Sequence, residues 1–193
     1  MSDQPAGPAT ELSALLPGDR IVFADGSDRA VSGVYACTET IAATTTEWRW
    51  LFLDDGSLLE SAPRGLFRYP RQVEYAPGTS LFEELLAQDG ALVRFEARVR
   101  AGTLDQRPIH LTLEGQRFQL HATGNVTARL FGTAPALPAW QRLANDSSQN
   151  VYFLLRAVEG DAVVLGLWTD SLGLAYGVRI VADDLAVLVQ RPH

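Results

Sequence analysis

The sequence predicts an all-β protein with one short helix, in which antiparallel strands form small barrels or a sandwich in two β subdomains. Alternating apolar runs recur roughly every eight to twelve residues, a spacing typical of sandwiches and barrels. Turn-forming pairs separate several of these runs, among them Asp55-Gly56 and Gly160-Asp161. A clear helical pattern occurs in one segment, 80–89. Strands should therefore outnumber helices in the fold.

The length allows one large domain or two small ones. The chain has 193 residues, of which 47% are hydrophobic and 20% charged, the composition of a folded globular protein. Residues 1–10 are rich in Pro, Ala and Gly and should form a flexible tail. We expect an SH3-like β subdomain at 11–78. A second antiparallel β subdomain should follow at 79–193 and contain the helix 80–89.

The first subdomain should begin with a helical turn, a tight turn and two strands. Residues 11–16 can form one helical turn, and the Pro-Gly step within 16–19 predicts a tight turn. Apolar alternation then predicts strands at 20–26 and 29–41. Gly33 interrupts the second strand, where we expect a bulge or bend.

The next segment, 44–61, has the strongest hairpin pattern in the chain, with Asp55-Gly56 as a two-residue loop. The strand pairs that follow from this loop are Phe52 with Leu59, Leu51 with Glu60, and Glu47 with Arg64. The opposite charges of the last pair support this register. One face of the hairpin would carry Trp48, Trp50, Phe52 and Leu59. We interpret this face as core rather than as an aromatic binding platform, because a continuous apolar strand face is normally buried.

The other face of the hairpin is apolar near the turn and charged away from it. Another domain or a partner should cover its apolar end, because exposed apolar patches mark interaction surfaces. Trp140 lies in a long connection, 133–150, which is a second candidate for partner contact. The candidate binding residues are Leu51, Leu53, Leu58, Arg49 and Trp140.

A helix and a strand open the second subdomain. Ser80 is expected to cap the helix 80–89, Glu83 to complete a capping box, and Gly90 to end the helix. Residues 91–102 alternate between apolar and charged side chains, which predicts a half-buried strand.

A hairpin at 107–124 should follow, turning at Gly115-Gln116. In this register His110 lies opposite His121. Two imidazoles so placed could bind a metal, but a metal site needs three or four ligands and the same face offers few others. We therefore assign no metal, and interpret both histidines as solvated strand residues.

The remaining segments predict further strands. A strand at 125–132 leads into the connection 133–150, which has at most one turn of helix at 138–143. A hairpin at 151–168 follows, and the last one or two strands lie within 170–190.

The charge balance excludes several classes of partner. Aspartate and glutamate number 23 against 16 basic residues, all of them arginine, for a net charge of -7. This acidity argues against non-specific nucleic-acid binding and against docking on an anionic membrane surface. Because the chain has no lysine, it lacks the lysine of a phosphate-binding P-loop and cannot form a Schiff base. No apolar run reaches membrane-spanning length, and we expect a soluble, cytoplasmic protein.

No catalytic residue or cofactor is assigned from the sequence. Cys37 is the single cysteine, which excludes an intrachain disulfide, and we expect it to be a small buried hydrophobe. The nucleophile motif G-x-S-x-G and the dinucleotide motif G-x-G-x-x-G do not occur.

The order of motifs resembles a family of bacterial β-rich domains of unknown function. The likeness covers residues 12–182 and depends on "LLPGDRIVFADGSDRAVSGVYAC", "TTTEWRWLFLDDGSLLES", "LEGQRFQLHATGNVTARLFGTAP" and "VYFLLRAVEGDAVVLGLW". Its marker residues here are Leu16, Gly18, Asp19, Val31, Gly33, Trp48 or Trp50, Leu58, Leu59 and Trp140. The chain departs from the family where 137–150 is less aromatic and where acidic residues near 155 are missing.

The resemblance implies a context rather than a mechanism. Such domains are encoded beside small membrane proteins, polyamine-synthase-like enzymes and phage-shock-type envelope-stress proteins. This implies an accessory or assembly role in envelope stress, at the cytoplasmic face of the membrane, with a membrane-associated partner. The family supplies no catalytic residues to carry over.

Three functions are compatible with the sequence. The leading one is a non-enzymatic, soluble β-domain that binds a protein partner as an accessory or scaffold. The first alternative is a barrel that binds a small cationic ligand such as a polyamine, because carboxylates are in excess. The second alternative is a hydrolase with a dispersed site of carboxylates and His110 and His121.

Overall fold

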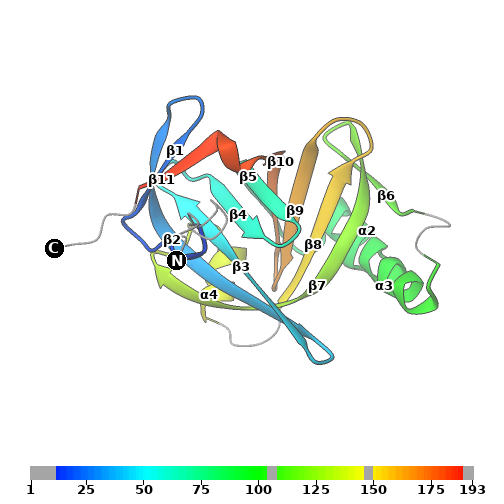
Figure 1. The fold of residues 1–193 in the computed structure, drawn as a ribbon. Coiled ribbons are helices and arrows are strands. Elements are labelled where there is room, and N and C mark those ends of the chain that lie inside the picture. Colours follow the sequence, from blue (N-terminus) through cyan, green and yellow to red (C-terminus); the bar gives the residue numbers. More distant parts are fainter. Residues whose placement is uncertain (1–11, 104–107, 146–149, 189–193) are drawn as a thin grey trace.

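The computed structural model describes residues 12–103, 108–145 and 150–188. The chain forms a closed antiparallel barrel of eight strands, with further strands and helices around it (Figure 1). In order around the barrel the strands are β2 (Asp28–Ile41), β3 (Thr44–Leu53), β4 (Leu58–Ala62), β5 (Gly65–Tyr75), β10 (Leu172–Ile180), β9 (Ala162–Trp168), β8 (Asn150–Ala157) and β7 (Gln116–Gly132). Pairing of β2 with β7 closes the barrel. The predicted all-β, antiparallel class is confirmed.

Both of the predicted subdomain ranges contribute strands to this one barrel. The range 11–78 supplies β2 to β5, and the range 79–193 supplies β7 to β10. Strands from the two ranges pair on both sides, β5 with β10 and β2 with β7. The two ranges therefore share a single closed wall.

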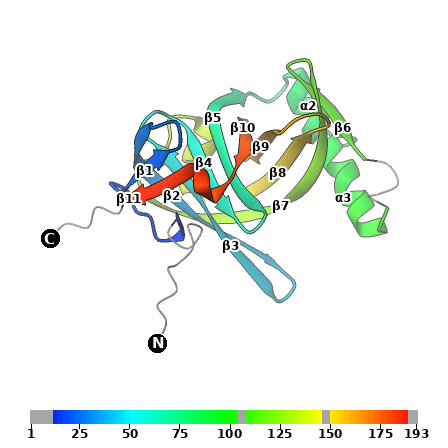
Figure 2. The same cartoon turned by 45° about the horizontal axis from the view of Figure 1, so that its top comes forward.

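Three groups of elements cover the outside and one end of the barrel (Figures 1 and 2). On one side lie β1 (Arg20–Phe23) and β11 (Leu185–Leu188), which pair with each other, and a short 3-10 turn, Ala182–Asp184. On the other side lie α2 (Ser80–Leu86), α3 (Ala91–Ala101) and β6 (His110–Leu113). Helix α4 (Pro138–Asn145) packs at one end.

Apolar side chains from all eight barrel strands fill the interior. They include Tyr35 and Cys37 from β2, Trp48, Trp50 and Phe52 from β3, Leu58 from β4, Phe67 and Tyr69 from β5, Val126 from β7, Tyr152 and Leu154 from β8, Leu165 and Leu167 from β9, and Ala175 from β10. Trp48 and Trp50 are 5% and 0% exposed, so their predicted place in the core is confirmed. The buried position predicted for Cys37 is also confirmed.

Helix α4 inserts Trp140 into one end of this interior. The Trp140 ring lies 5.3 Å from that of Trp50 and 5.2 Å from that of Phe52, both edge-to-face. The Tyr35 hydroxyl donates a hydrogen bond of 2.5 Å to the Trp140 carbonyl oxygen. The connection 133–150 thus contains a longer helix than the single turn predicted, because its apolar side closes the barrel.

Two further apolar clusters lie on the outer faces of the barrel wall. One joins outward side chains of β2, β3 and β4 to the N-terminal turn, β1 and β11. The other joins outward side chains of β7 to β10 to α2, α3 and β6. These strands are therefore buried on both faces, which explains why several read as continuous apolar runs.

The loop of the β3–β4 hairpin contains three residues rather than the predicted two. The Leu53 N–H donates to the Ser57 carbonyl oxygen at 2.9 Å, and the Gly56 N–H donates to Leu53 at 3.0 Å. Gly56 has a φ of 81°, the left-handed conformation that this type of turn requires at its third position. The Asp55 carboxylate accepts hydrogen bonds from Ser57 and stabilises the longer loop.

The longer loop shifts the β3–β4 register by one residue from the prediction. The observed pairs are Trp50 with Glu60, Leu51 with Leu59, and Phe52 with Leu58. Because side chains alternate between faces, Leu58 and Glu60 turn into the barrel and Leu59 turns outward. The predicted pair of Glu47 and Arg64 is wrong, since Arg64 pairs with Glu60 and Glu47 lies opposite Thr38.

The strand predicted at 91–102 is wrong, because this segment forms α3. The residues that it buries, at helical spacing, are Ala91, Leu92 and Phe95. Val93 and Val99, which the strand pattern placed inside, are exposed. Ala, Leu, Arg and Glu are strong helix formers, and their propensity outweighs the alternating pattern here. Gly102 ends the helix in the left-handed conformation.

The helix predicted at 80–89 is confirmed as the shorter α2, but its predicted capping is wrong. Thr79 is the N-cap residue and makes no side-chain capping bond, so Ser80 lies inside the first turn. Gly90 is the N-cap of α3 rather than the end of α2. A Cβ on Gly90 would overlap the backbone of Leu85, so glycine permits the close step between the two helices.

The β6–β7 hairpin turns at Glu114 and Gly115 rather than at Gly115-Gln116. Both residues have positive φ angles, 51° and 80°, which define a type I′ turn. The register therefore places His110 opposite Gln119 and not opposite His121. Strand β7 then continues without a break through the separate strand predicted at 125–132.

Truncation of Trp140 tests whether its side chain closes one end of the barrel interior. We expect Trp140→Ala to lower the free energy of unfolding by about 3–5 kcal/mol, because it empties a fully buried aromatic site. The matched control is Trp168→Ala at the end of β9, whose side chain is only half-buried and should cost less than half as much. Urea unfolding measures both losses, and equal losses would contradict the assignment.

Candidate functional site

The structure buries most of the residues predicted to bind a partner. Leu51 and Leu53 lie in the outer cluster under the N-terminal turn, β1 and β11. Leu58 and Trp140 lie inside the barrel. Arg49 donates a hydrogen bond to the Leu15 carbonyl oxygen at 3.1 Å. The chain itself therefore supplies the cover that the leucine face requires.

The two histidines of the β6–β7 hairpin do not lie opposite each other. Among the described residues, no three His, Cys, Asp or Glu side chains gather where they could hold a metal ion. His121 lies at a bulge in β7, between Leu120 and Ala122, and its neighbours cover it only in part. This partial burial, followed by the positive charges of Arg156 and Arg64, lowers the pKa of His121.

A polar cluster lies inside the barrel, at the end away from α4. Glu60 is 0% exposed and accepts a hydrogen bond of 2.7 Å from the Tyr69 hydroxyl. Arg64, in the turn between β4 and β5, forms an ion pair with the Glu60 carboxylate. The Arg64 guanidinium carbon lies 4.9 Å from the centre of the Tyr152 ring and 5.7 Å from that of Trp48. Arg64 therefore covers this end of the aromatic core.

The sequence contained little sign of this cluster. Glu60 follows two leucines in a strand pattern that placed it on the mixed outer face of the hairpin, with Leu51 and Leu53. The one-residue register shift turns Glu60 inward, next to Tyr69. Burial and the nearby Glu60 carboxylate raise the pKa of Tyr69 well above its usual value. Burial and a hydrogen bond to Glu39 raise the pKa of Tyr152 to about 12. Both phenols thus remain hydrogen-bond donors near neutral pH.

A second candidate site lies where the barrel wall opens. The β2–β7 pairing runs from Gly33 and Gly132 to Thr38 and Thr127 and then ends. On the same edge of β7, β6 pairs only as far as Gln119, with one more bond at Leu120. Among the described residues, no strand pairs with 121–126 on this edge.

Glu39 partly fills the opening between β2 and β7. Its carboxylate accepts a hydrogen bond of 3.1 Å from the Asn125 backbone N–H and one of 2.9 Å from the Tyr152 hydroxyl. A Cβ on Gly124 would overlap the Glu39 carboxylate, so a larger residue here would displace Glu39 from this position. The Glu39 carboxylate therefore takes the place of one backbone acceptor of a neighbouring strand, and it also contacts Tyr152 in the interior of the barrel.

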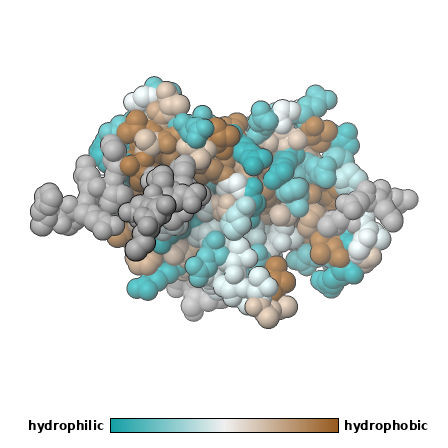
Figure 3. Space-filling view, in the orientation of Figure 1, coloured by the Kyte–Doolittle hydropathy of each residue, from teal (hydrophilic) through white to brown (hydrophobic). Residues whose placement is uncertain are grey.

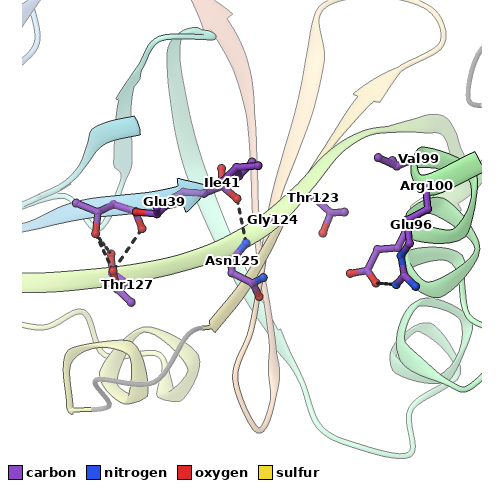
Figure 4. A pocket seen from close by; sticks show the side chains of 11 residues that line it. Glu39, Ile41, Glu96, Val99, Arg100, Thr123, Gly124, Asn125 and Thr127 are labelled. Carbon is purple, nitrogen blue, oxygen red and sulfur yellow. Dashed lines mark hydrogen bonds and ion pairs between the residues drawn. The ribbon is translucent and has the colours of Figure 1, made fainter. Parts of the chain in front are cut away.

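The opening is the floor of a surface groove of about 470 Å³. Figure 4 shows its lining from three elements: Glu39 and Ile41 of β2; Thr123, Gly124, Asn125 and Thr127 of β7; and Glu96, Val99 and Arg100 of α3. Ile41 is 67% and Val99 49% exposed, while Glu96 and Arg100 pair with each other. Apolar surface is visible at the tip of the β2–β3 hairpin (Figure 3). The groove thus combines free backbone with apolar flanks.

Comparisons with known proteins supply no relative. No family model matches the chain, and no curated protein or solved structure matches it either. The resemblance described above therefore stays a prediction. Within the described residues, no helix has the length and apolar character needed to cross a membrane.

The pKa of His121 tests whether Arg156 and Arg64 lie close to it. We expect an NMR titration to give a pKa below 6.5 and Arg156→Gln to move it toward 6.5. Arg94→Gln on α3 is the control and should leave the titration unchanged. Because the folded pKa lies below the unfolded value, the contribution of His121 to stability is complete above pH 6.5. It is lost as pH falls through the folded pKa.

An unshifted pKa in the wild-type protein, or equal effects of the Arg156 and Arg94 substitutions, would contradict the placement of these three groups.

Proposed function

We propose that the protein is a non-enzymatic binding module that takes up an extended segment of a partner protein as an added strand along β7. The observation that carries this proposal is the edge of β7 at 121–126, between the segments paired with β6 and β2. No strand of the described residues pairs with it, and only its Asn125 N–H is bonded, to the Glu39 carboxylate. At roughly 3.3 Å per residue this edge is about 20 Å long, the length of a typical strand. The segment would lie in the groove between β2 and α3.

The backbone supports strand addition. In an antiparallel sheet, the N–H and C=O groups of alternate residues point to opposite edges. Thr133 donates to Ser32 across the closing pair, and Asn125 donates to Glu39, so odd-numbered residues of this stretch face β2. The N–H and C=O of Thr123 therefore point into the groove. Such groups on an exposed edge are a template for another chain.

The side chains support an extended, β-branched segment as the occupant. Ile41 and Val99 stand exposed on the two sides of the groove, and threonines line its floor. A partner strand that alternates apolar and polar residues can bury its apolar side chains against these flanks. Main-chain hydrogen bonds then supply affinity, and the flanks supply selectivity.

A peptide selection tests the proposal. A random-peptide library displayed on phage is selected against the intact protein, and the enriched peptide is measured by calorimetry. We expect enrichment of alternating segments with Val, Ile or Thr. Thr123→Pro should weaken binding at least about tenfold, because proline removes the N–H that faces the groove. The same N–H is not used in pairing with β8, so the barrel should be retained.

The control variant is Thr45→Pro, in the part of β3 that pairs with β2 alone. It places the same substitution on another strand edge and should leave binding unchanged. Ile41→Asp is a second test variant, which removes an apolar flank without altering the backbone, and it should also weaken binding. Failure to enrich any peptide, or peptides that bind Thr123→Pro as tightly as the wild type, would refute strand addition.

A further inference from the structure

We propose that the barrel end built by Glu60, Tyr69, Trp48 and Tyr152 is a binding site for a guanidinium or alkylammonium cation, and that the chain's own Arg64 occupies it. This site is separate from the proposed peptide groove and does not depend on it. Removal of Arg64 should leave a cage that a small cation of the same chemistry can fill.

The cage has the features that recognise an organic cation. The guanidinium carbon of Arg64 lies 4.9 Å from the ring centre of Tyr152 and 5.7 Å from that of Trp48, within the range of cation–π attraction. The Glu60 carboxylate forms the ion pair with Arg64 and is held by the Tyr69 hydroxyl. Two ring faces and one oriented carboxylate thus surround the cation.

The buried carboxylate sets the sign of the ligand charge. Glu60 is fully buried, and a buried carboxylate without a positive partner is strongly unfavourable. Loss of Arg64 would remove the ion-pair partner of Glu60, so the emptied cage would favour a cation over a neutral or anionic molecule. Glu39, bonded to the Tyr152 hydroxyl, adds a second carboxylate next to the same ring.

The strand pairing of the barrel does not involve Arg64. It lies in the short turn between β4 and β5, outside the paired residues, which end at Ala62 and Gly65. Its Nε is buried and has no hydrogen-bond partner among the described residues, and the same holds for the indole Nε1 of Trp48 and of Trp50. The cage therefore satisfies the charge of Arg64 but not all of its donors, and unsatisfied buried donors are costly. A cation that replaces Arg64 and lacks such a donor avoids this cost.

Because Arg64 fills the cage, it should also lower the affinity of the wild-type protein for an added cation. A ligand can enter only in the fraction of molecules in which Arg64 has left the cage, and its affinity falls by that fraction. Wild type should therefore bind a free cation weakly, and an Arg64 variant should bind it more tightly.

Chemical rescue tests the site. Methylguanidinium, ethylammonium and spermidine are titrated at millimolar concentrations into Arg64→Ala, with the melting temperature and the Trp indole NMR signals as readouts. We expect Arg64→Ala to be less stable than wild type and to recover saturably with at least one probe. Binding should be at least about tenfold tighter than in wild type. The double variant Arg64→Ala, Glu60→Gln should show no recovery.

The matched control is Arg68→Ala on the outer face of β5. Arg68 is as buried as Arg64, with side-chain exposures of 22% and 21%. The Arg68 guanidinium carbon lies 3.8 Å from the centre of the Phe23 ring, and Arg68 pairs with Asp25 and Asp55. Arg68→Ala therefore removes a similar ring contact and similar ion pairs, but outside the barrel. Absence of saturable recovery in Arg64→Ala, or equal recovery in Arg68→Ala, would overturn the proposal.

If Arg64→Ala does not fold, the same titration of the wild-type protein tests the site. Saturable shifts of the Trp48 indole signal with a probe, absent in Glu60→Gln, would support the site, and no shift would overturn it. The three probes also separate the ligand classes, because methylguanidinium can stack flat on a ring whereas ethylammonium presents a compact charge.

Discussion

The pairing of β2 with β7 is the interaction on which the rest of the structure depends, because it joins the two halves of the chain into a closed wall. At one end, Gly33 lies at a bulge where a Cβ would overlap the Thr133 carbonyl oxygen. At the other end, the hydroxyls of Thr38 and Thr127 bond to each other at 2.7 Å. Beyond that pair the strands separate, and no strand within the described ranges pairs with the next residues of β7 on this edge. Closure thus creates both the enclosed interior and the opening in its wall.

The enclosed interior is mainly aromatic, and its polar atoms are concentrated at one end. Trp140 fills the end at α4, whereas Glu60, Arg64 and Tyr69 occupy the other. A buried ion pair of this kind is weak evidence for stability, because desolvation offsets much of its attraction. The Arg64 guanidinium lies against two aromatic rings, and the proposed cation site rests on this arrangement. Glu39 connects this interior to the groove through its bonds to Tyr152 and to the β7 backbone.

Local patterns in the sequence predicted the strands well, and long-range pairing poorly. Alternation and turn residues located most strands, the buried tryptophans and the bulge at Gly33, since each depends on neighbours in the chain. The three-residue loop at Gly56 moved one register by a single residue, and that shift alone carried Glu60 from the outer face of the barrel wall to the interior. The alternation in α3 was misread because helix propensity decided the outcome. The open edge of β7 depends on where β2 and β6 stop pairing, which no local pattern records.

Residue-resolved hydrogen exchange of the free protein tests the central claim most directly, since it reports which backbone groups are paired. Closure at β2 predicts strong protection of the Arg129 amide, which lies opposite Ala36 in the closing pair. The open edge predicts that the Thr123 amide, six residues away on the same strand, exchanges far faster. Comparable protection of Thr123 and Arg129 would show that the β7 edge is already paired, and would contradict the account.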